Sequence, residues 1–472
     1  MKRQTGWRIY WRAAKKSPFD LAYGESHESF RKPAFASFSQ MKGYRWKRNS
    51  ILVRIGSFFQ RWIRYRAKYP PVGRSCQVRV IAGTANQRAA LTPVVESLVS
   101  RGIDVQFHHA FNEVDGDWGA LNSQAQVWCL LLIPSMIWRM LTASVEHWRT
   151  MKWGFDQQWL SLGYYVAFQR WLAKYPCQIF LVSNDHSCFS RTAAIAAGDL
   201  GVTTMYMQHA SVTPFFPPLS FDLATLDGEN ALNSYLQAGP TNTEIYLAGM
   251  AKFDHFASRV HALSPVRRVG VAVNMLDPQE RIIQVLEELA KIDLLEHVTL
   301  RPHPRTGLQV MAALRADCDR LGFGFSHPAE EGAFDFLDRQ DMIVAGHSGI
   351  LLEAALMDVY PLCYDFAKDH YDGYGFIAHG LCERFEEASQ LGEKVRHLSA
   401  MPQRPSVRRR AAFFCETAGT AYEGQTAELL AQIIIRRLAG QPPAPCWRKT
   451  SVNGYVVYKP QIKDDDESSA PS

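Results

Sequence analysis

Residues 341–361, DMIVAGHSGILLEAALMDVYP, contain a short apolar run, a turn rich in glycine and serine, and the start of an apolar helix. The run predicts a buried strand, and the turn predicts a tight connection to the helix. Gly346 and Gly349 let the backbone approach a bound group closely, and Ser348 adds a hydroxyl. The unpaired N–H groups at a helix start attract anions. The stretch therefore predicts a phosphate-binding turn that suits a nucleotide diphosphate.

A second polar cluster follows another apolar run. HVTL at 297–300 predicts a strand, and RPHPRT at 301–306 continues it with two cations and a histidine. Ligands of doubly wound sheets bind outside the carboxyl ends of the strands, so we expect both clusters at one edge. The residues predicted to bind the nucleotide and its phosphates are Arg301, His303, Arg305, His347, Ser348, Gly349 and, on ribose hydroxyls, Glu353. An ordinary histidine, a helix cap and a solvated glutamate are the alternative interpretations.

From residue 75 onward, β-branched runs alternate with segments of helical periodicity. This pattern predicts an α/β fold with two doubly wound, Rossmann-like domains that face each other across a cleft. The predicted organisation is a basic helical N-terminal extension (1–74), an N-terminal acceptor domain (75–256), a C-terminal nucleotide-donor domain (257–440) and a partly disordered tail (441–472).

Three strand ends in the first half of the chain are polar: NDHS at 184–187, QHAS at 208–211 and DGE at 227–229. His209 is a candidate general base, because an imidazole titrates near neutral pH. Asp185 either orients that histidine or acts as the base itself, and Asp227 is a third candidate. Polar loops also follow strands for the sake of solubility, so each residue has a purely structural alternative.

The composition is that of a globular protein, since 47% of the 472 residues are hydrophobic. The nine cysteines form no CxxC pair. Their scatter argues for a reducing compartment and against a disulfide framework or a structural zinc site. Residues 1–17 lack the apolar core of a secretory signal. These features predict a cytoplasmic protein.

Much of the positive charge lies near the N-terminus, where Lys and Arg alternate with aromatic residues. RIGSFFQRWIRYRAKY at 54–69 predicts an amphipathic cationic helix, either on a membrane surface or packed on the main body. VWCLLLIPSMIWRML at 127–141 is too short for a membrane span and predicts a buried or membrane-facing helix. We expect peripheral contact with the cytoplasmic face of the inner membrane. Nucleic acid is not expected, since no RNA-binding or zinc signature occurs.

Four motifs together resemble those of bacterial glycosyltransferases of the two-Rossmann-domain type, called GT-B. They are QHAS (208–211), GMAKFD (249–254), RPHP (301–304) and AGHSGILLEAALMDVYP (345–361). They are most similar to the transferases of capsule and other surface polysaccharides, including polysialyltransferase-like enzymes, with CDP-glycerol glycerophosphotransferases as relatives. The resemblance covers residues 77–439. It implies transfer of a sugar from a nucleotide-sugar donor to a surface polysaccharide or glycolipid acceptor, by an inverting displacement without a metal or another cofactor.

The resemblance also implies roles for single residues. His303 matches the histidine that contacts the donor phosphates and supports departure of the nucleotide, and Ser348 matches a serine that binds the same phosphates. His209 stands where the glycerophosphotransferases have a proposed base. The polysialyltransferases instead use an acidic motif that Leu226-Asp227-Gly228 matches only in part. The base therefore stays open among His209, Asp227 and Asp185. The alternative functions are a CDP-glycerol-type polyol-phosphate transferase, a sugar-nucleotide epimerase and a non-catalytic component of a polysaccharide assembly complex.

Overall fold

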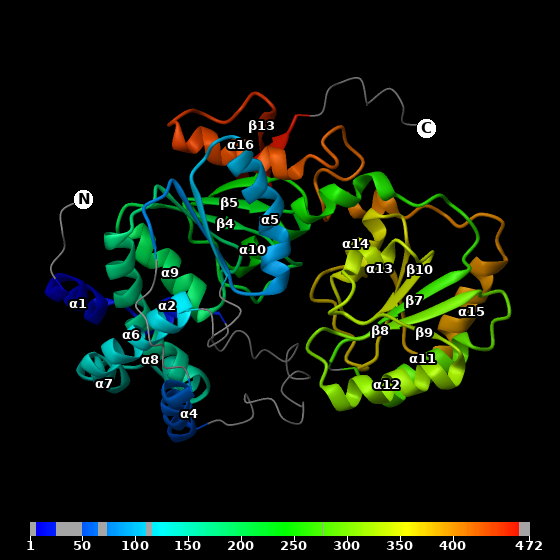
Figure 1. Ribbon diagram of the computed structural model, residues 1–472, viewed down its shortest axis with the longest axis horizontal. Coiled ribbons are helices and arrows are strands. Elements are labelled where there is room, and N and C mark those ends of the chain that lie inside the picture. Colours follow the sequence, from blue (N-terminus) through cyan, green and yellow to red (C-terminus); the bar gives the residue numbers. More distant parts are fainter. Residues whose placement is uncertain (1–5, 25–49, 65–72, 110–115, 276, 462–472) are drawn as a thin grey trace. The chain divides into compact units, whose positions relative to one another are not determined.

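The computed structural model describes residues 6–24, 50–64, 73–109, 116–275 and 277–461. The chain divides into two compact units. Unit 1 combines residues 1–252 with 425–472, and unit 2 contains residues 253–424. Each unit has a sheet of mainly parallel strands covered by helices (Figure 1). The predicted α/β fold with two Rossmann-like sheets is confirmed.

The sheet of unit 1 has the strand order β13-β14-β6-β5-β4-β3-β1-β2. Its strands are β1 (Val78–Ala82), β2 (Val105–His109), β3 (Ile179–Val182), β4 (Thr203–Met207), β5 (Leu223–Leu226), β6 (Glu244–Leu247), β13 (Trp447–Val452) and β14 (Tyr455–Pro460). Neighbouring strands are parallel except for the hairpin β13–β14. Because β2 lies on one side of β1 and β3 on the other, the strand order reverses between β1 and β3. Such a topological switch point is where ligands bind in these folds.

Helices pack around this sheet and around one another. They are α1 (Gly6–Lys15), α2 (Pro18–Leu21), α4 (Ile51–Arg64), α5 (Ala85–Ser100), α6 (Gly116–Leu131), α7 (Ile133–Leu141), α8 (Val145–Lys174), α9 (Cys188–Gly198), α10 (Glu229–Ala238) and α16 (Thr426–Leu438). The long helix α8 supplies much of the core, with Leu162, Val166 and Phe168 fully buried. Ser144 and Ser187 cap α8 and α9 by accepting hydrogen bonds from backbone N–H groups.

The N-terminal segments belong to unit 1 and pack on its helices. The Arg191 side chain of α9 donates to the carbonyl of Asp20 at 2.8 Å, and Gly24, at φ +127°, lies against the backbone of His186. In α4, Phe58 stacks on Trp159 of α8 at 4.2 Å between ring centroids. The predicted helix at 54–69 therefore forms and packs on the main body over its described part, while residues 65–69 lie outside the described residues.

The sheet of unit 2 has the order β12-β11-β10-β7-β8-β9, and all its pairs are parallel. Its strands are β7 (Arg268–Ala272), β8 (His297–Arg301), β9 (Gly324–Phe325), β10 (Met342–Ala345), β11 (Tyr360–Tyr364) and β12 (Glu383–Phe385). Its helices are α11 (Gln279–Leu289), α12 (Leu308–Leu321), α13 (Ala333–Leu337), α14 (Ile350–Leu356) and α15 (Ala388–Ala400), with the 3₁₀ segments η4 (Ala251–Arg259) and η5 (Arg408–Ala411). The strand order reverses between β7 and β10, which makes this pair the switch point of unit 2.

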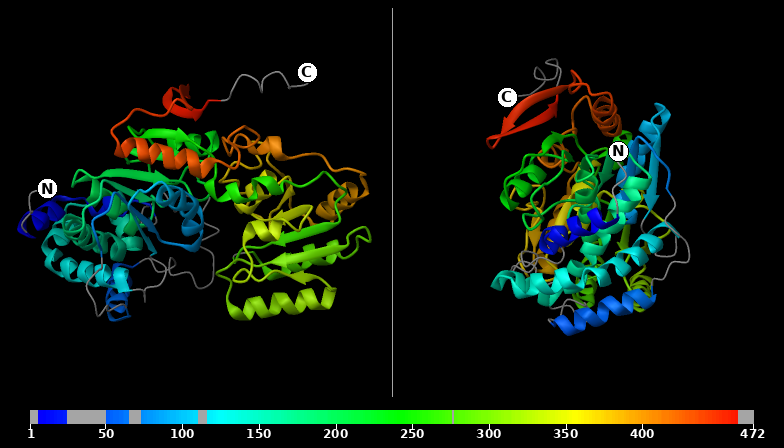
Figure 2. Two further views of the ribbon diagram at one scale, coloured as in Figure 1. Left: turned by 45° about the horizontal axis from the view of Figure 1, so that its top comes forward. Right: turned by 90° about the vertical axis from the view of Figure 1, so that its left-hand side faces the viewer.

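The C-terminal part of the chain differs from the predicted organisation. Helix α16 packs on α5 in unit 1, although it was predicted within a second domain of residues 257–440. Within the tail, which was predicted to be partly disordered, residues 447–460 form the hairpin β13–β14, which extends the sheet of unit 1 through β14 and β6 (red in Figure 2). Tyr458 stacks on Tyr246 of β6 at 4.7 Å, in addition to the backbone pairing of β14 with β6. Residues 462–472 lie outside the described residues.

The apolar stretch at 127–141 forms parts of two helices rather than one. Helix α6 ends at Leu131 and α7 begins at Ile133, because Pro134 has no N–H group to continue the hydrogen bonding of α6. Cys129, Leu132 and Met136 are buried, whereas several of their apolar neighbours are exposed. Among the described residues, no helix is long and apolar enough to cross a bilayer.

Candidate functional site

In unit 2, both motifs predicted from the sequence lie beside the switch point. RPHP follows β8 and GHSG follows β10, and the two strands flank β7. Asp277, in the loop after β7, lies beside the turn that follows β10. A Cβ atom built on Gly346 would lie 3.4 Å from the carboxylate of Asp277. The sheet topology thus brings three strand ends together at the carboxyl edge of unit 2.

His303 is held in one tautomer. Its Nδ1 accepts the backbone N–H of Arg305 at 3.0 Å, so the neutral ring carries its proton on Nε2. Burial and the nearby Arg305 lower the pKa of the ring. His303 is therefore a neutral hydrogen-bond donor at the end of β8, while the Arg305 side chain is exposed beside it.

Arg301 is engaged inside unit 2. It is buried, and its guanidinium donates to Ser326 Oγ at 2.7 Å and to the carbonyl of Glu331 at 2.8 Å. Burial lowers its pKa, while the charges of Glu331 and Glu353 raise it. These contacts hold the guanidinium against the residues that follow β9. They do not support the prediction that Arg301 binds phosphate. Glu353 is buried in α14 and acts on Arg301 electrostatically, rather than lying open to a ribose.

His347 is likewise engaged, although its neighbour Ser348 is not buried. The Nε2 atom of His347 accepts the N–H of Tyr374 at 3.2 Å, and its ring stacks on Tyr374 at 4.0 Å. Burial lowers the pKa of His347 to about 4. Ser348 and Gly349 are half-buried directly before α14. His347 therefore binds to the loop at 371–374. Ser348 and Gly349 remain partly accessible at the turn before α14.

Asp277 was not predicted from the sequence. Its Oδ2 accepts the N–H of Asn274 at 2.6 Å, and its pKa is raised to about 7 by burial, with the charges of Asp365 and Asp369 adding to the effect. A carboxyl group that keeps its proton near neutral pH adds little negative charge to a phosphate site. The sequence showed only an Asp-Pro pair, which is typical of turns.

One group of potential metal ligands occurs among the described residues. Asp365, His370 and Glu386 each offer an atom within 4.8 Å of the others. His370 Nδ1 lies 3.0 Å from Glu386 and 3.7 Å from Asp365. An imidazole between two carboxylates forms ion pairs without a metal when it is protonated, so the three residues do not by themselves indicate a metal centre.

In unit 1, His209 follows β4 and borders a cavity of about 10 Å³ that Asp227 and Lys252 also line. That volume accommodates about one water molecule. Burial, together with the nearby charges of His186 and Lys252, lowers the pKa of His209 to about 3. Nδ1 of His209 has no hydrogen-bond partner among the described residues. The ring is thus neutral, and its Nδ1 atom is buried.

Asp185 holds a different histidine from the one predicted. Its Oδ1 lies 2.9 Å from Nδ1 of His186, and its Oδ2 accepts the hydroxyl of Tyr235 at 2.8 Å. Because its single hydroxyl proton is donated to Asp185, Tyr235 accepts from the hydroxyl of Tyr206 at 2.9 Å. Asp185 is buried and follows β3 at the switch point of unit 1. A buried carboxylate on one nitrogen orients the ring and favours its protonated form. His186 belongs to the NDHS motif at 184–187, but it was not among the predicted site residues.

Asp227 is buried, and its backbone N–H donates to Oε1 of Gln208 at 2.9 Å. Asp227 and His209 line the same small cavity of unit 1.

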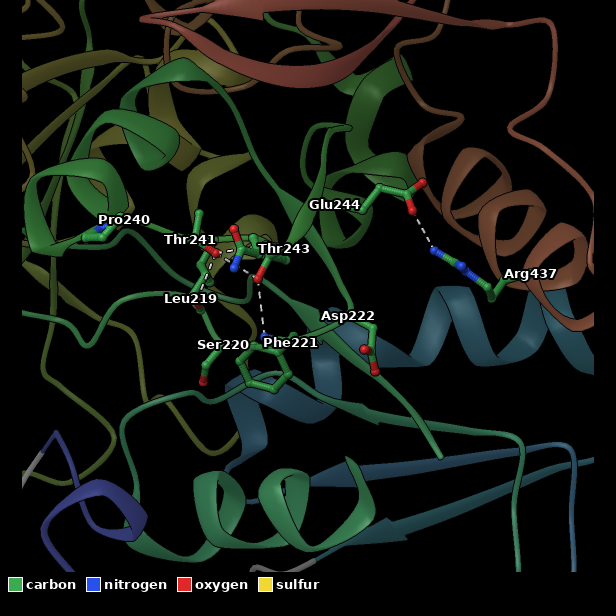
Figure 3. Close-up of a pocket in the computed structure, with 10 residues that line it drawn as sticks. Leu219, Ser220, Phe221, Asp222, Pro240, Thr241, Thr243, Glu244 and Arg437 are labelled. Atoms are coloured by element: carbon green, nitrogen blue, oxygen red, sulfur yellow. Dashed lines mark hydrogen bonds and ion pairs between the residues drawn. The ribbon is translucent and has the colours of Figure 1, made fainter. Parts of the chain in front are cut away.

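Two further cavities lie at the opposite ends of the strands. In unit 1, a cavity of about 640 Å³ is lined by residues that precede or begin β5 and β6, including Asp222 and Glu244. Figure 3 shows that some of its polar groups are bonded to one another: Thr241 is bonded to Thr243, and Glu244 is paired with Arg437. In unit 2, a cavity of about 580 Å³ lies beside the amino ends of β7 and β8. Neither cavity contains a predicted site residue.

Comparisons with known proteins agree with this fold. The sequence matches no protein-family model and no curated protein. Among solved structures, a Neisseria meningitidis UDP-GlcNAc 2-epimerase bound to UDP-GlcNAc is similar at 13% identity and a TM-score of 0.50, over 77% of this chain and 100% of the other. A Listeria monocytogenes protein assigned as a UDP-N-acetylglucosamine 2-epimerase has 12% identity and a TM-score of 0.50, over 78% and 98%. The wall teichoic acid polymerase TagF has 9% identity and a TM-score of 0.48, over 85% and 99%. The chain has the GT-B class of fold, with two Rossmann-like units.

Proposed function

We propose that the protein is a glycosyltransferase that moves a sugar from a nucleotide-activated donor to a polysaccharide or glycolipid acceptor. The observation that carries the proposal is the placement of the sequence motifs. Within each unit, polar residues that were selected from the sequence lie at the carboxyl edge, at or beside the switch point where such sheets bind ligands. Nucleotide-activated donors and the nine cysteines without disulfide partners both fit a cytoplasmic protein.

The residues of unit 2 suit the diphosphate of the donor. His303 offers its Nε2 proton, Ser348 offers a hydroxyl, and the exposed Arg305 adds a positive charge. Asp277 keeps a proton near neutral pH, which limits repulsion of the phosphates. In the proposed reaction the bond from the sugar carbon to the diphosphate oxygen breaks. Hydrogen bonds from these donors then stabilise the charge on the leaving nucleotide.

The residues of unit 1 suit activation of an acceptor hydroxyl. His186 is the favoured base, because the Asp185 carboxylate stabilises the imidazolium that forms when the ring takes the proton. His209 is the second candidate. It lies near Asp227 and Lys252 after β4, but its low pKa makes it a weak base. The acceptor oxygen forms its bond to the sugar carbon as the nucleotide leaves, which gives inversion.

The test is product analysis by mass spectrometry. The full-length protein is incubated with CMP-sugars, UDP-sugars or CDP-glycerol, each with an oligosaccharide or glycolipid acceptor. The proposal expects a glycosylated acceptor and a free nucleotide from one sugar donor. Transfer of glycerol phosphate would instead identify a polyol-phosphate transferase. If no donor is consumed, the protein is not a transferase of these classes.

A second candidate function is epimerisation of a UDP-sugar. It is favoured by the two structures with a TM-score of 0.50, which are described as UDP-N-acetylglucosamine 2-epimerases. The same experiment separates the two, because an epimerase converts UDP-N-acetylglucosamine to its C2 epimer when no acceptor is present.

A further inference from the structure

A group of large apolar side chains is exposed on the N-terminal helices of unit 1. Trp7 and Trp11 of α1 are 70% and 60% exposed, and Trp138 and Leu141 of α7 are 64% and 76% exposed. Leu131 of α6 and Ile137 of α7 are about half exposed as well. We call Trp7, Trp11, Leu131, Ile137, Trp138 and Leu141 the apolar face. Single exposed apolar residues are ordinary, but a cluster of this kind marks an interaction surface.

Hydrogen bonds hold the helices of the apolar face together. The hydroxyl of Tyr10 donates to the carbonyl of Leu131 at 3.1 Å. Ser135 Oγ donates to the carbonyl of Ala14 at 2.9 Å, and Arg139 donates to the carbonyl of Lys15 at 2.8 Å. Helix α1 therefore lies against the end of α6 and along α7.

Each helix buries one side and exposes the other. Ile9 and Ala13 of α1 are buried, whereas Trp7 and Trp11, one turn apart, are exposed. In α7, Met136 is buried, whereas Ile137 and Leu141, also one turn apart, are exposed. The buried sides fix both helices in unit 1. The exposed sides are thus a second apolar surface that folding does not require.

Most of the charges around the apolar face are positive. Helices α1 and α7 contain Arg8, Arg12, Lys15 and Arg139 and no acidic residue. Arg12 donates to the carbonyl of Asp199, and Arg139 donates to the backbone carbonyl of Lys15. The side chains of Arg8 and Lys15 are exposed. Helix α8 adds the exposed Arg149 and Lys152, together with the exposed Glu146.

We propose that the apolar face binds the surface of a bilayer that contains anionic phospholipids. Tryptophan is enriched where a bilayer meets water, since its ring is apolar and its N–H is polar. The exposed Arg8 and Lys15 complement anionic headgroups. The helices lie in the interface rather than crossing it, in agreement with the lack of a spanning helix among the described residues. Four of its residues belong to the stretch 127–141, for which a buried or membrane-facing helix was predicted. The other predicted membrane segment, at 54–69, is not part of this surface, and its helix α4 buries Arg54 and Phe58.

The test is co-sedimentation of the full-length protein with vesicles of phosphatidylcholine alone or with about 30% phosphatidylglycerol. The first variant combines Trp7→Gln, Trp11→Gln, Trp138→Gln and Leu141→Gln. The control variant combines Leu294→Gln, Leu308→Gln, Val310→Gln and Val456→Gln, which replace apolar side chains exposed elsewhere. Circular dichroism checks that both variants fold.

The wild type and the control variant are expected to bind the anionic vesicles, and the first variant at least about tenfold more weakly. A second variant, Arg8→Gln with Lys15→Gln, is expected to lose about fivefold per charge on anionic vesicles only. The proposal is overturned if the first variant binds as tightly as the control. It is also overturned if the wild type does not bind vesicles but forms a dimer, and the first variant is monomeric. In that case a second copy of the chain would cover the apolar face.

Discussion

At the scale of single residues, hydrogen bonds to backbone N–H groups decide what each histidine can do. His303 accepts through Nδ1 and is left as a donor through Nε2, whereas His347 accepts through Nε2 within its own loop. The sequence could predict that both residues follow strands, since HVTL and MIVA are apolar and partly β-branched. It could not predict the tautomers, nor that Arg301 bonds to Ser326 and Glu331, because those partners are brought to it by the fold.

Asp277 predicts a pH dependence of stability. Its pKa is about 7 in the folded protein, against an ordinary value of 3.8, so between these values the folded state holds a proton that the unfolded chain releases. Its contribution therefore favours folding at low pH and is lost as the pH rises toward 7. Asp277→Asn removes this loss of stability at higher pH, because asparagine does not titrate. The amide oxygen of the new side chain can still accept the backbone N–H of Asn274. We expect the variant to gain stability relative to the wild type between about pH 4.5 and pH 8.

Urea unfolding at the two pH values measures the effect. Asp319→Asn, which changes an exposed aspartate of α12, serves as the control and should show no such gain. An equal stability difference for Asp277→Asn at both pH values would contradict the assigned pKa.

At the scale of elements, the helices of unit 1 pack closely at one glycine. A Cβ atom on Gly163 of α8 would lie 2.0 Å from the carbonyl of Ala125 in α6. Alanine normally stabilises a helix relative to glycine by about 1 kcal/mol. Here we expect Gly163→Ala to destabilise the protein by about 1–3 kcal/mol, because α6 must move away.

The matched control for this substitution is Gly56→Ala in α4, where a Cβ atom would meet nothing within 4 Å. It is expected to leave stability unchanged or to raise it by up to about 1 kcal/mol. Thermal unfolding of both variants checks the prediction. A stable Gly163→Ala protein would show that α6 and α8 are not packed as described.

Element boundaries were predictable where local sequence determines them. Strands β1 to β10 were predicted from their apolar runs, whereas β11 and β12 were not. The separation of α6 from α7 at Pro134 was not predicted either, since residues 127–141 were expected to form one helix. The hairpin of the tail was not predicted, because WRKTSV and YVVYKP are rich in charged and polar residues. Those strands form only because β6 offers an edge for β14.

At the scale of the whole molecule, the chain returns to unit 1 after unit 2 is complete. The hairpin therefore stabilises a sheet whose adjoining strand, β6, lies about 200 residues earlier, as the pairing of Val457 with Ile245 shows. Truncation after Gly440 exposes the edge of β6 and the ring of Tyr246. We expect it to lower the free energy of unfolding by at least about 2 kcal/mol.

Truncation after Gln461, which keeps the hairpin, is the control and should leave the unfolding midpoint unchanged. Chemical denaturation followed by circular dichroism measures both. Equal stability of the two truncated proteins would mean that the hairpin contributes nothing to unit 1.

The central claim is that the carboxyl edge of unit 2 binds the diphosphate of a nucleotide-activated donor. Isothermal titration of the full-length protein with CMP, CDP and UDP tests it most directly. The variants are His303→Ala and the control His327→Ala, whose Nδ1 accepts the N–H of Ala329 in the same local arrangement after β9 rather than β8. We predict that at least one nucleotide binds the wild type and His327→Ala equally, and His303→Ala at least about tenfold more weakly. Equal binding to all three proteins, or binding of no nucleotide to any, would contradict the claim.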